Sequence, residues 1–269
     1  MKHENDIYDQ LEALQDRSPF LLRSFLRFED HNFMECMAGG TLEARIQRHQ
    51  VRDPATGIIS VTSYEPTDLV LRWIAQVADA AAWLESKLNL AHGDIRPSNI
   101  LLDGHDNVRL ADFNNTVRIG QPLEVGGPPY ARFQGGEAGD ESGTHGFAGA
   151  RTEQFAIGTV LYSLTRGHEP FANELGDEQG PEVVARLQAM NFPDLDKNDL
   201  TDQIIANCWY ARFASVQEVA VATRQVQREP YVVCQAPDEA YLTRQAQCVD
   251  SRNQCVELIE KDISSITYF

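Results

Sequence analysis

The amino-acid sequence predicts an α+β fold that is mainly helical, and three observations predict this class. After residue 66 a long stretch repeats apolar residues every three or four positions, which is typical of a helix that packs on a core by one face. Helical spacing returns in residues 182–226. Two brief apolar runs, Ile100–Leu102 and Val108–Ala111, flank a polar turn that begins at Asp103, which is typical of a β-hairpin.

The first third of the chain alternates between short helical and extended patterns. Residues 4–15 have helical spacing that Pro19 ends, and residues 21–28 form a strand-like apolar run. Residues 33–42 lead an apolar run into a Gly-Gly pair, which predicts a strand, a turn and the start of a helix. Residues 51–66 carry two prolines and a glycine, and we expect a loop there.

The remaining elements follow the long helix, for which Thr67 and Asp68 are both suitable N-caps. Residues 115–150 are rich in glycine and poor in large apolar residues. A stretch of this length without regular structure is usually functional or disordered, and we expect residues 120–150 to be mobile. One more helix is expected over residues 238–261.

The composition limits the classes of function. The chain has 269 residues, of which 42% are hydrophobic, and a formal charge of −17 at pH 7. This suits one large domain or two small ones. The acidic charge argues against nucleic-acid binding and against an anionic membrane surface, although it tolerates a basic peptide substrate. An acidic surface without any meaning for partners explains the same charge.

Cysteine usage and the N-terminus indicate an intracellular, cytoplasmic protein. The cysteines form no C-x-x-C pair, and one of the five is left over: Cys36, Cys208, Cys234, Cys248 and Cys255. This pattern indicates reduced thiols rather than a disulfide framework. The polar first residues precede no apolar run, so we expect no signal peptide. No stretch reaches the roughly eighteen apolar residues of a membrane helix.

The most informative stretch reads His92-Gly93-Asp94-Ile95-Arg96-Pro97-Ser98-Asn99, and after the hairpin it continues as Asp112-Phe113-Asn114. The hairpin places Asp94 and Asn99 on one side and Asp112 on the other, so that all three can converge on one point. Converging carboxylate and amide oxygens suit magnesium that carries phosphates. A carboxylate beside them suits a base that accepts the proton of a hydroxyl group.

This stretch resembles the catalytic loop, H-R-D-L-K-P-x-N, and the metal motif, D-F-G, of eukaryotic protein kinases of the serine/threonine group. The resemblance implies a protein kinase-like fold, mainly its helical C-lobe, with ATP and Mg2+ as cofactors. It implies that Asp94 is the catalytic base and Arg96 the cation on the transferred phosphate. It also implies that Asn99 and Asp112 are the magnesium ligands. The alternative is that these short motifs occur by chance beside a surface hairpin.

Residues 33–42 resemble the hinge of the same family. The family resemblance implies five nucleotide-binding residues. Four lie in the hinge, Met34, Glu35, Cys36 and Met37, and the fifth is Leu101 after the catalytic loop. Met34 would be the gatekeeper, and the backbone of residues 35–37 would pair with adenine. Any strand–Gly-Gly–helix junction explains the pattern as well.

Residues 153–171 resemble the family pattern D-x-W-S-x-G, then an apolar helix, then T-G-x-x-P-F. Glu153 stands where the family has the Asp that anchors the backbone of the catalytic loop. An acid favoured by the dipole at a helix N-terminus explains Glu153 equally well. Residues 115–150 correspond to the activation segment, where the usual closing A-P-E is replaced by Gly149-Ala150-Arg151-Thr152.

Several residues depart from the family pattern. Gly93 replaces the Arg that pairs with a phosphate on the activation segment, so we do not expect control by such phosphorylation; alternatively, Gly93 only eases a tight turn. Arg96 replaces a Lys, which preserves the charge but changes the donor geometry. Asn114 replaces the Gly of the metal motif. Asn tolerates positive φ, so Asp112 can still turn inward.

The 32 residues before Phe33 contain neither G-x-G-x-x-G nor a strand lysine, because the only lysines are Lys2, Lys87, Lys197 and Lys261. These residues resemble the family's helix C and the strand after it, with Glu4 as the candidate ion-pair glutamate. We therefore expect a truncated kinase that binds ATP poorly and turns over slowly. We also expect apolar residues of the run 21–28 to be exposed.

The sequence thus predicts three parts: an N-lobe remnant over 1–32, a kinase C-lobe over 33–228, and a helical tail over 229–269 without an assigned function. The leading hypothesis is a phosphotransferase that moves the γ-phosphate of ATP to a serine or threonine of a protein substrate. The second is a pseudokinase that serves as a binding or scaffolding module. The third is a small-molecule phosphotransferase of the aminoglycoside-kinase type, whose loop commonly reads H-G-D. The sequence does not identify the substrate, the regulator or the oligomeric state.

Overall fold

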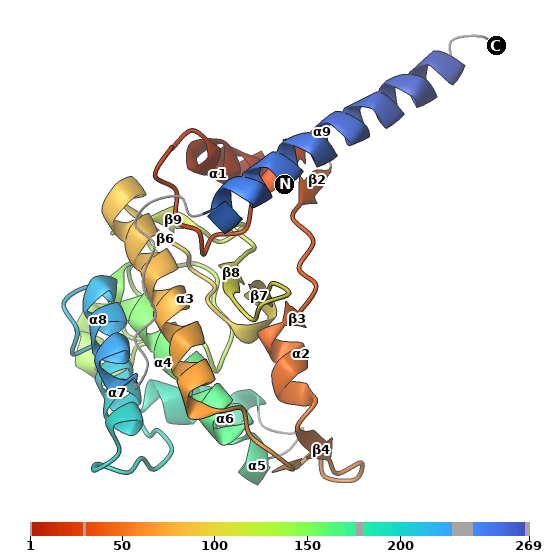
Figure 1. The fold of residues 1–269 in the computed structure, drawn as a ribbon. Helices are drawn as coiled ribbons and strands as arrows, with labels where there is room; N and C mark the ends of the chain where they lie inside the picture. Colours follow the sequence, from red (N-terminus) through yellow and green to blue (C-terminus); the bar gives the residue numbers. More distant parts are fainter. Residues whose placement is uncertain (1, 29–30, 176–179, 228–238, 267–269) are drawn as a thin grey trace.

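The computed structural model describes residues 2–28, 31–175, 180–227 and 239–266, so Cys234 and the predicted boundary at 228/229 lie outside them. Within these residues the fold is a helical body with small antiparallel sheets of two or three strands (Figure 1). The expectation of a mainly helical α+β fold is confirmed. None of the described helices is long and apolar enough to cross a membrane.

The centre of the body is α3 (Thr67–Leu88), whose apolar face is buried along most of its length. It packs against α4 (Ala150–Arg166) and α8 (Val216–Val226), while α7 (Leu200–Trp209) packs on α4. Pro66 occupies the N-cap position without a side-chain hydrogen bond, so neither Thr67 nor Asp68 caps the helix. The α3 helix ends at Asn89 in the left-handed conformation, immediately before the loop formed by residues 92–99 (the 92–99 loop).

The sheet beside the 92–99 loop has the order β3-β7-β8. Its strands are β3 (Gly40–Thr41), β7 (Ile100–Leu102) and β8 (Val108–Leu110), and the short 3-10 helix η1 (Pro97–Asn99) precedes β7. The predicted turn exists, because the Asp103 carboxylate accepts hydrogen bonds from the backbone amides of His105 and Asn107 at 2.8 and 2.9 Å. The two ends of the hairpin therefore lie side by side.

The N-terminal part consists of α1 (Lys2–Glu12), β1 (Ser24–Arg27) and β2 (Asn32–Met34). The expected exposure of the apolar run before and within β1 is wrong for most of its residues. Leu21 and Leu22 are 1% exposed, because the Leu22 amide donates to the carbonyl of Leu110 and Leu21 bridges to the same strand. At the end of the run, Phe28 is exposed.

The C-terminal helix α9 (Glu239–Ile266) confirms the helix expected over 238–261 for residues 239–261, and residue 238 lies outside the described residues. The N-terminal half of α9 lies near β1 and contacts it, whereas the C-terminal half of α9 projects away from the body (Figure 1). The buried Cys248 lies in the part that contacts the body. The N-terminal half of α9 therefore covers part of β1.

The predicted loop over residues 51–66 is instead partly a hairpin, β4 (Gln50–Arg52) with β5 (Ile59–Val61). The other elements are α2 (Leu42–Gln47), β6 (Leu90–Ala91), β9 (Val117–Arg118), η2 (Gly136–Glu141), α5 (Ala172–Leu175) and α6 (Gly180–Gln188). Among these elements, β6 pairs with β9 in a further two-stranded sheet.

Residues 115–149 (the 115–149 segment) form a long folded loop that closes on itself. The amides of Leu123 and Gln134 donate to the carbonyls of Gly146 and Thr144 at 2.9 and 2.8 Å. Tyr130 and His145 are buried in it. The segment has little regular structure, as expected, but its backbone is bonded at several points, and its mobility remains a prediction for amide exchange.

Candidate active site

The two ends of the β7–β8 hairpin bring Asp94, Asn99 and Asp112 to one region. The Asn99 side-chain amide donates to the backbone carbonyl and to the Oδ2 atom of Asp94, both at 3.0 Å. The amide of Ala111, next to Asp112, donates to the carbonyl of Asn99 at 2.9 Å. Asp94 and Asp112 are half-buried, so their carboxylates keep access to solvent. The structure thus brings Asp94 into contact with Asn99 and places Asp112 beside them.

Asp112 adopts a left-handed backbone with φ of 65°. Its Oδ1 atom accepts hydrogen bonds from the backbone amide and the side-chain amide of Asn114, at 3.3 and 2.9 Å. The positive φ that Asn114 was expected to tolerate occurs instead two residues earlier, on Asp112. Asn114 instead orients the Asp112 carboxylate through its side chain, which a glycine cannot do.

A buried aromatic stack holds this region to α1. The Phe113 ring meets the rings of Tyr8 and His92 at centroid distances of 5.1 and 5.3 Å. The Tyr8 hydroxyl donates to the sulfur of Met34 at 3.4 Å. Sequence reasoning missed Tyr8, although its place one turn after Glu4 on the buried face of a helix was a usable signal. The stack links α1, the 92–99 loop and the end of β2.

His92 is buried beneath both carboxylates. Burial lowers the pKa of its imidazole, and the nearby charges of Asp94 and Asp112 act in the opposite direction. The imidazole is bonded to the carbonyl of Ala111 at 3.0 Å. His92 therefore serves as a packed support for the site.

Glu4 lies in the same region and is 7% exposed. Burial raises the pKa of its carboxyl, and the charge of Asp112 adds to that effect. A hydrogen bond with the backbone of Phe113 lowers the pKa. The hydrogen-bond partner of Glu4 is thus the backbone of Phe113, next to Asp112.

Glu153 anchors the 92–99 loop from the first turn of α4. Its two carboxylate oxygens accept hydrogen bonds from the backbone amides of His92 and Gly93, at 2.8 and 3.1 Å. Burial raises the pKa of Glu153 to about 7, against the effect of these hydrogen bonds. The two explanations that the sequence offered for Glu153 therefore hold together.

Gly93 has a steric reason of its own. Its φ is +80°, and a Cβ atom at this position would lie 2.3 Å from the carbonyl oxygen of Asn115. No other residue fits there without displacing the start of the 115–149 segment. The tight-turn explanation of Gly93 is confirmed.

The residues expected to bind adenine are more exposed than the residues around Asp94 and Asn99. Met34 is 40% exposed, and Cys36 is exposed as well. The amide of Glu35 is already bonded to the carbonyl of Arg23 at 3.1 Å, and the carbonyl of Met37 accepts the amide of Gly40 at the same distance. These two groups are thus engaged within the chain, and the hinge backbone retains fewer free groups than the sequence implied.

Leu101, the remaining residue expected at the nucleotide site, lies on β7 opposite Thr41 and is half-buried. Its neighbour Leu102 accepts the amide of Gly39 at 2.9 Å. This pairing ties the glycine turn after the hinge to the hairpin that carries the 92–99 loop. Leu101 therefore lies on the strand that connects the hinge turn to the 92–99 loop.

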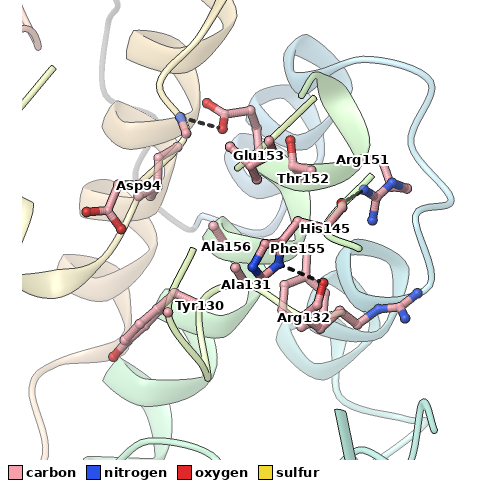
Figure 2. Close-up of a pocket in the computed structure, with 14 residues that line it drawn as sticks. Asp94, Tyr130, Ala131, Arg132, His145, Arg151, Thr152, Glu153, Phe155 and Ala156 are labelled. Carbon is pink, nitrogen blue, oxygen red and sulfur yellow. Dashed lines mark hydrogen bonds between the residues drawn. The ribbon is translucent and has the colours of Figure 1, made fainter. Parts of the chain in front are cut away.

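Figure 2 shows a pocket between the 92–99 loop and the 115–149 segment, with Asp94 on one side. The guanidinium groups of Arg132 and Arg151 lie on the opposite side and point away from Asp94 (Figure 2). The cavity has a volume of about 20 Å³, which is room for one water molecule. It is too small for a substrate and represents the packed joint between the two segments.

The donor set of the site suits magnesium rather than a metal held by the protein alone. The described residues contain no cluster of three or more His, Cys, Asp or Glu side chains that could hold a metal ion. Magnesium in phosphate sites is bound by one or two carboxylates together with phosphate oxygens and water. The Asp112 carboxylate and the Asn99 amide oxygen fit that requirement.

Comparison with known proteins gives one family. A family model described as "Protein kinase domain" matches residues 21–208, which is more than half of the chain. CBL-interacting protein kinase 25 of Oryza sativa subsp. japonica is 26% identical over 207 residues, covering 66% of this chain and 36% of that protein. Serine/threonine-protein kinase MRCK gamma of Mus musculus is 28% identical over 185 residues, covering 65% and 11%.

A third relative is Rho-associated protein kinase 1 of Homo sapiens, which is 24% identical over 201 residues. The match covers 69% of this chain and 13% of that protein. The chain therefore spans about a third or less of the length of the curated relatives that it matches.

Proposed function

The chain belongs to the protein kinase family, and from that premise we propose that it transfers the γ-phosphate of ATP to a serine or threonine hydroxyl of a protein. The observation that carries the proposal is the pair formed by the Asp94 carboxylate and the Asn99 amide at 3.0 Å. This pair lies on a loop whose backbone Glu153 holds by two hydrogen bonds. Phosphoryl transfer depends mainly on such positioning and on charge stabilisation.

In this proposal each residue of the site has one role. Asp94 accepts the proton of the attacking hydroxyl group, and its contact with Asn99 fixes the direction of the carboxylate. Asn99 and Asp112 hold the magnesium ion, which when bound neutralises charge on the phosphates. Arg96 supplies a further cation on the transferred group. Asn114 keeps the Asp112 carboxylate in place.

We further propose that residues 1–269 bind ATP weakly and turn over slowly. Before the hinge the sequence contains one lysine, Lys2, whose side chain is exposed, and the partner of Glu4 is the backbone of Phe113. Among the described residues around Glu4, no other lysine is thus available to place a cation on the α- and β-phosphates. The exposure of Met34 also supports weak binding, because a covered gatekeeper would bury apolar surface against adenine.

A pseudokinase is the second candidate, and the backbone partner of Glu4 favours it. The third hypothesis, a small-molecule phosphotransferase, rested on Gly93 in the sequence H-G-D. Because the contact with Asn115 explains Gly93, this residue no longer favours that group. The protein kinase therefore stays in first place.

A phosphotransfer assay with radiolabelled ATP and magnesium tests the proposal. The acceptors are a basic protein, an aminoglycoside and choline. We expect label on protein only, and a loss of about 10²–10⁴-fold in Asp94→Asn, which is the range for removal of a general base. Asp106→Asn is the matched control, because that carboxylate lies on the hairpin turn and pairs with Arg45 at 3.2 Å; it should transfer like the wild type.

The other outcomes identify the alternatives. Label on the aminoglycoside or on choline that Asp94→Asn abolishes would favour the small-molecule phosphotransferase. Nucleotide binding without any Asp94-dependent transfer would favour the pseudokinase.

A further inference from the structure

Arg96 extends from the 92–99 loop toward the 115–149 segment. Its guanidinium carbon lies 5.8 Å from the centroid of the Tyr130 ring, which is within the range of a cation–π contact. One of its terminal nitrogens lies 3.7 Å from the position that a Cβ atom of Gly127 would occupy. Its Nε atom is buried and has no hydrogen-bond partner among the described residues. Contacts with the 115–149 segment therefore help to fix the position of the Arg96 guanidinium group.

Tyr130 is itself fixed in place. Tyr130 is 5% exposed, and it lines a small pocket together with Ser163 and Glu169. Burial raises the pKa of Tyr130, so the hydroxyl stays protonated and available as a donor. Ser163 belongs to α4, and Glu169 follows that helix. The ring under Arg96 is thus attached to the core of the helical body.

Glu169 acts on Arg96 as well as on Tyr130. Burial raises the pKa of the Glu169 carboxyl, whereas the hydrogen bond with Tyr130 and the charge of Arg96 lower it. The opposite charges of Arg96 and Glu169 therefore attract each other, although both residues are only half-buried. The Arg96 cation has an aromatic face on one side and a carboxylate in its field.

We propose that Tyr130 is a positioning residue that holds Arg96 at the transfer site, so that the place of the 115–149 segment sets the place of the transfer cation. This inference rests on the proposed function. Where Gly93 stands, the family pattern has an arginine that links the same two parts of the chain through a phosphate. Tyr130 links them without a phosphate.

The physical reason is the flexibility of an arginine side chain. A free arginine loses rotamer freedom each time that it reaches a phosphate, and a guanidinium group held against a ring has lost it already. A held cation also costs no reorganisation when charge develops in the transition state. Tyr130 should therefore affect turnover more than nucleotide affinity.

The chain contains a matched control with the same three chemical groups. The Arg166 guanidinium lies 5.4 Å from the Tyr162 ring and binds the Asp202 carboxylate at 2.6 Å. These residues belong to α4 and α7, and none lies on the 92–99 loop or the 115–149 segment. Tyr162→Leu removes an equivalent ring from under an arginine that has no place in the proposed transfer.

A double-mutant cycle on the transfer rate tests the link. We expect Tyr130→Leu to lower kcat about tenfold with little change in the KM for ATP, and Arg96→Ala to lower kcat at least as much. The double variant should be no slower than Arg96→Ala alone, because Tyr130 acts through Arg96. Tyr130→Phe should retain most of kcat, since it keeps the ring. Losses that multiply in the double variant would overturn the proposal.

A second measurement does not depend on activity. In the 1H–15N spectrum of the arginine side chains, the Nε–H signal of Arg96 should be displaced by the ring current of Tyr130. Tyr130→Leu should remove that displacement, whereas Tyr162→Leu should leave it unchanged. A wild-type Arg96 signal at the position of an exposed arginine, or one that Tyr130→Leu does not move, would overturn the proposal. If wild-type protein shows no Asp94-dependent transfer, the proposed function fails, and this spectrum alone decides whether Tyr130 holds Arg96.

Discussion

The candidate site has a transfer side, formed by the 92–99 loop and Asp112, and a hinge side, formed by residues 33–37. The transfer side is much more deeply buried than the hinge side. On the transfer side, His92 and Phe113 are fully buried and Asn99 is 8% exposed. On the hinge side, Met34 is 40% exposed and Cys36 is exposed. The transfer motif therefore coincides with the core of the fold, whereas the hinge residues lie on its rim. A mutation on the first side should reduce stability as well as function, and a mutation on the second side should reduce stability less.

The difference follows from the sheets that carry the two sides. The β7–β8 hairpin is covered by α3 and joined by β3, and the Glu153 carboxylate ties its loop to α4. The hinge follows β1–β2, a two-stranded sheet that packs on α1 and contacts α9. Isolated two-stranded sheets are marginal in water and depend on such packing.

The largest contrast is expected between two phenylalanines. Phe113→Ala should lower the free energy of unfolding by about 3–5 kcal/mol, because it empties a fully buried site between Tyr8 and His92. Phe33→Ala removes a half-buried ring of β2 and should cost less than half as much. Denaturant unfolding of the two variants measures both values. Equal losses would show that the hinge side is packed as firmly as the transfer side.

The second prediction concerns the Glu153 anchor of the transfer side. Its carboxyl has an ordinary pKa of 4.5 and a pKa of about 7 in the folded protein. Between these values the folded state keeps a proton that the unfolded chain has lost, so the contribution of Glu153 to stability falls as the pH rises from 4.5 to 7. The fall should be on the order of 3 kcal/mol.

Glu153→Gln isolates this effect, because the amide does not titrate. Urea unfolding of the wild type and of Glu153→Gln at pH 5 and pH 7.5 gives the stability difference between them at each pH. The wild type should lose its advantage, or increase its deficit, by roughly 3 kcal/mol at the higher pH. A difference that is the same at both values would mean that the two amide hydrogen bonds outweigh burial and keep Glu153 ionised.

The smallest effect is expected at the contact between α9 and β1. Cys248 is 8% exposed in α9, and Cys248→Ser places a hydroxyl group in that contact, at a cost of about 1 kcal/mol. Cys255→Ser is the matched control, because Cys255 is only half-buried on the same helix. Amide exchange in β1 should become faster in Cys248→Ser alone. Unchanged exchange in both variants would show that α9 does not support the hinge side.

The sequence was most informative where local pattern and burial coincide. The apolar spacing of α3 and the runs of β7 and β8 predicted the elements that carry Asp94 and Asp112. Glu153 was found by its place in the D-x-W-S-x-G pattern. The burial of Leu21 and Leu22 was missed, because their partner Leu110 lies far away in the sequence. The β4–β5 hairpin was missed because β4 contains only one apolar residue, Val51, and because Pro54 and Gly57 made the stretch resemble a loop.

Tyr130 was missed for another reason. It lies in a stretch rich in glycine and proline, where no periodicity marks a residue as buried. Tyr130 is buried in the main apolar core, whose members such as Phe155 follow more than twenty residues later. The left-handed backbone of Asp112 was also beyond prediction, because Asn114 was the residue that seemed suited to it.

Calorimetry with ATP and magnesium on wild type, Asp94→Asn and Asp112→Asn tests most directly whether the transfer side has separate roles for base and metal. Asp112→Asn should weaken magnesium-dependent nucleotide binding at least tenfold, which corresponds to about 1.4 kcal/mol. Asp94→Asn should leave the affinity within about threefold of the wild type, because the proton acceptor contributes to transfer and not to binding. Equal weakening by both substitutions, or none by Asp112→Asn, would contradict the assignment of Asp94 as base and Asp112 as magnesium ligand.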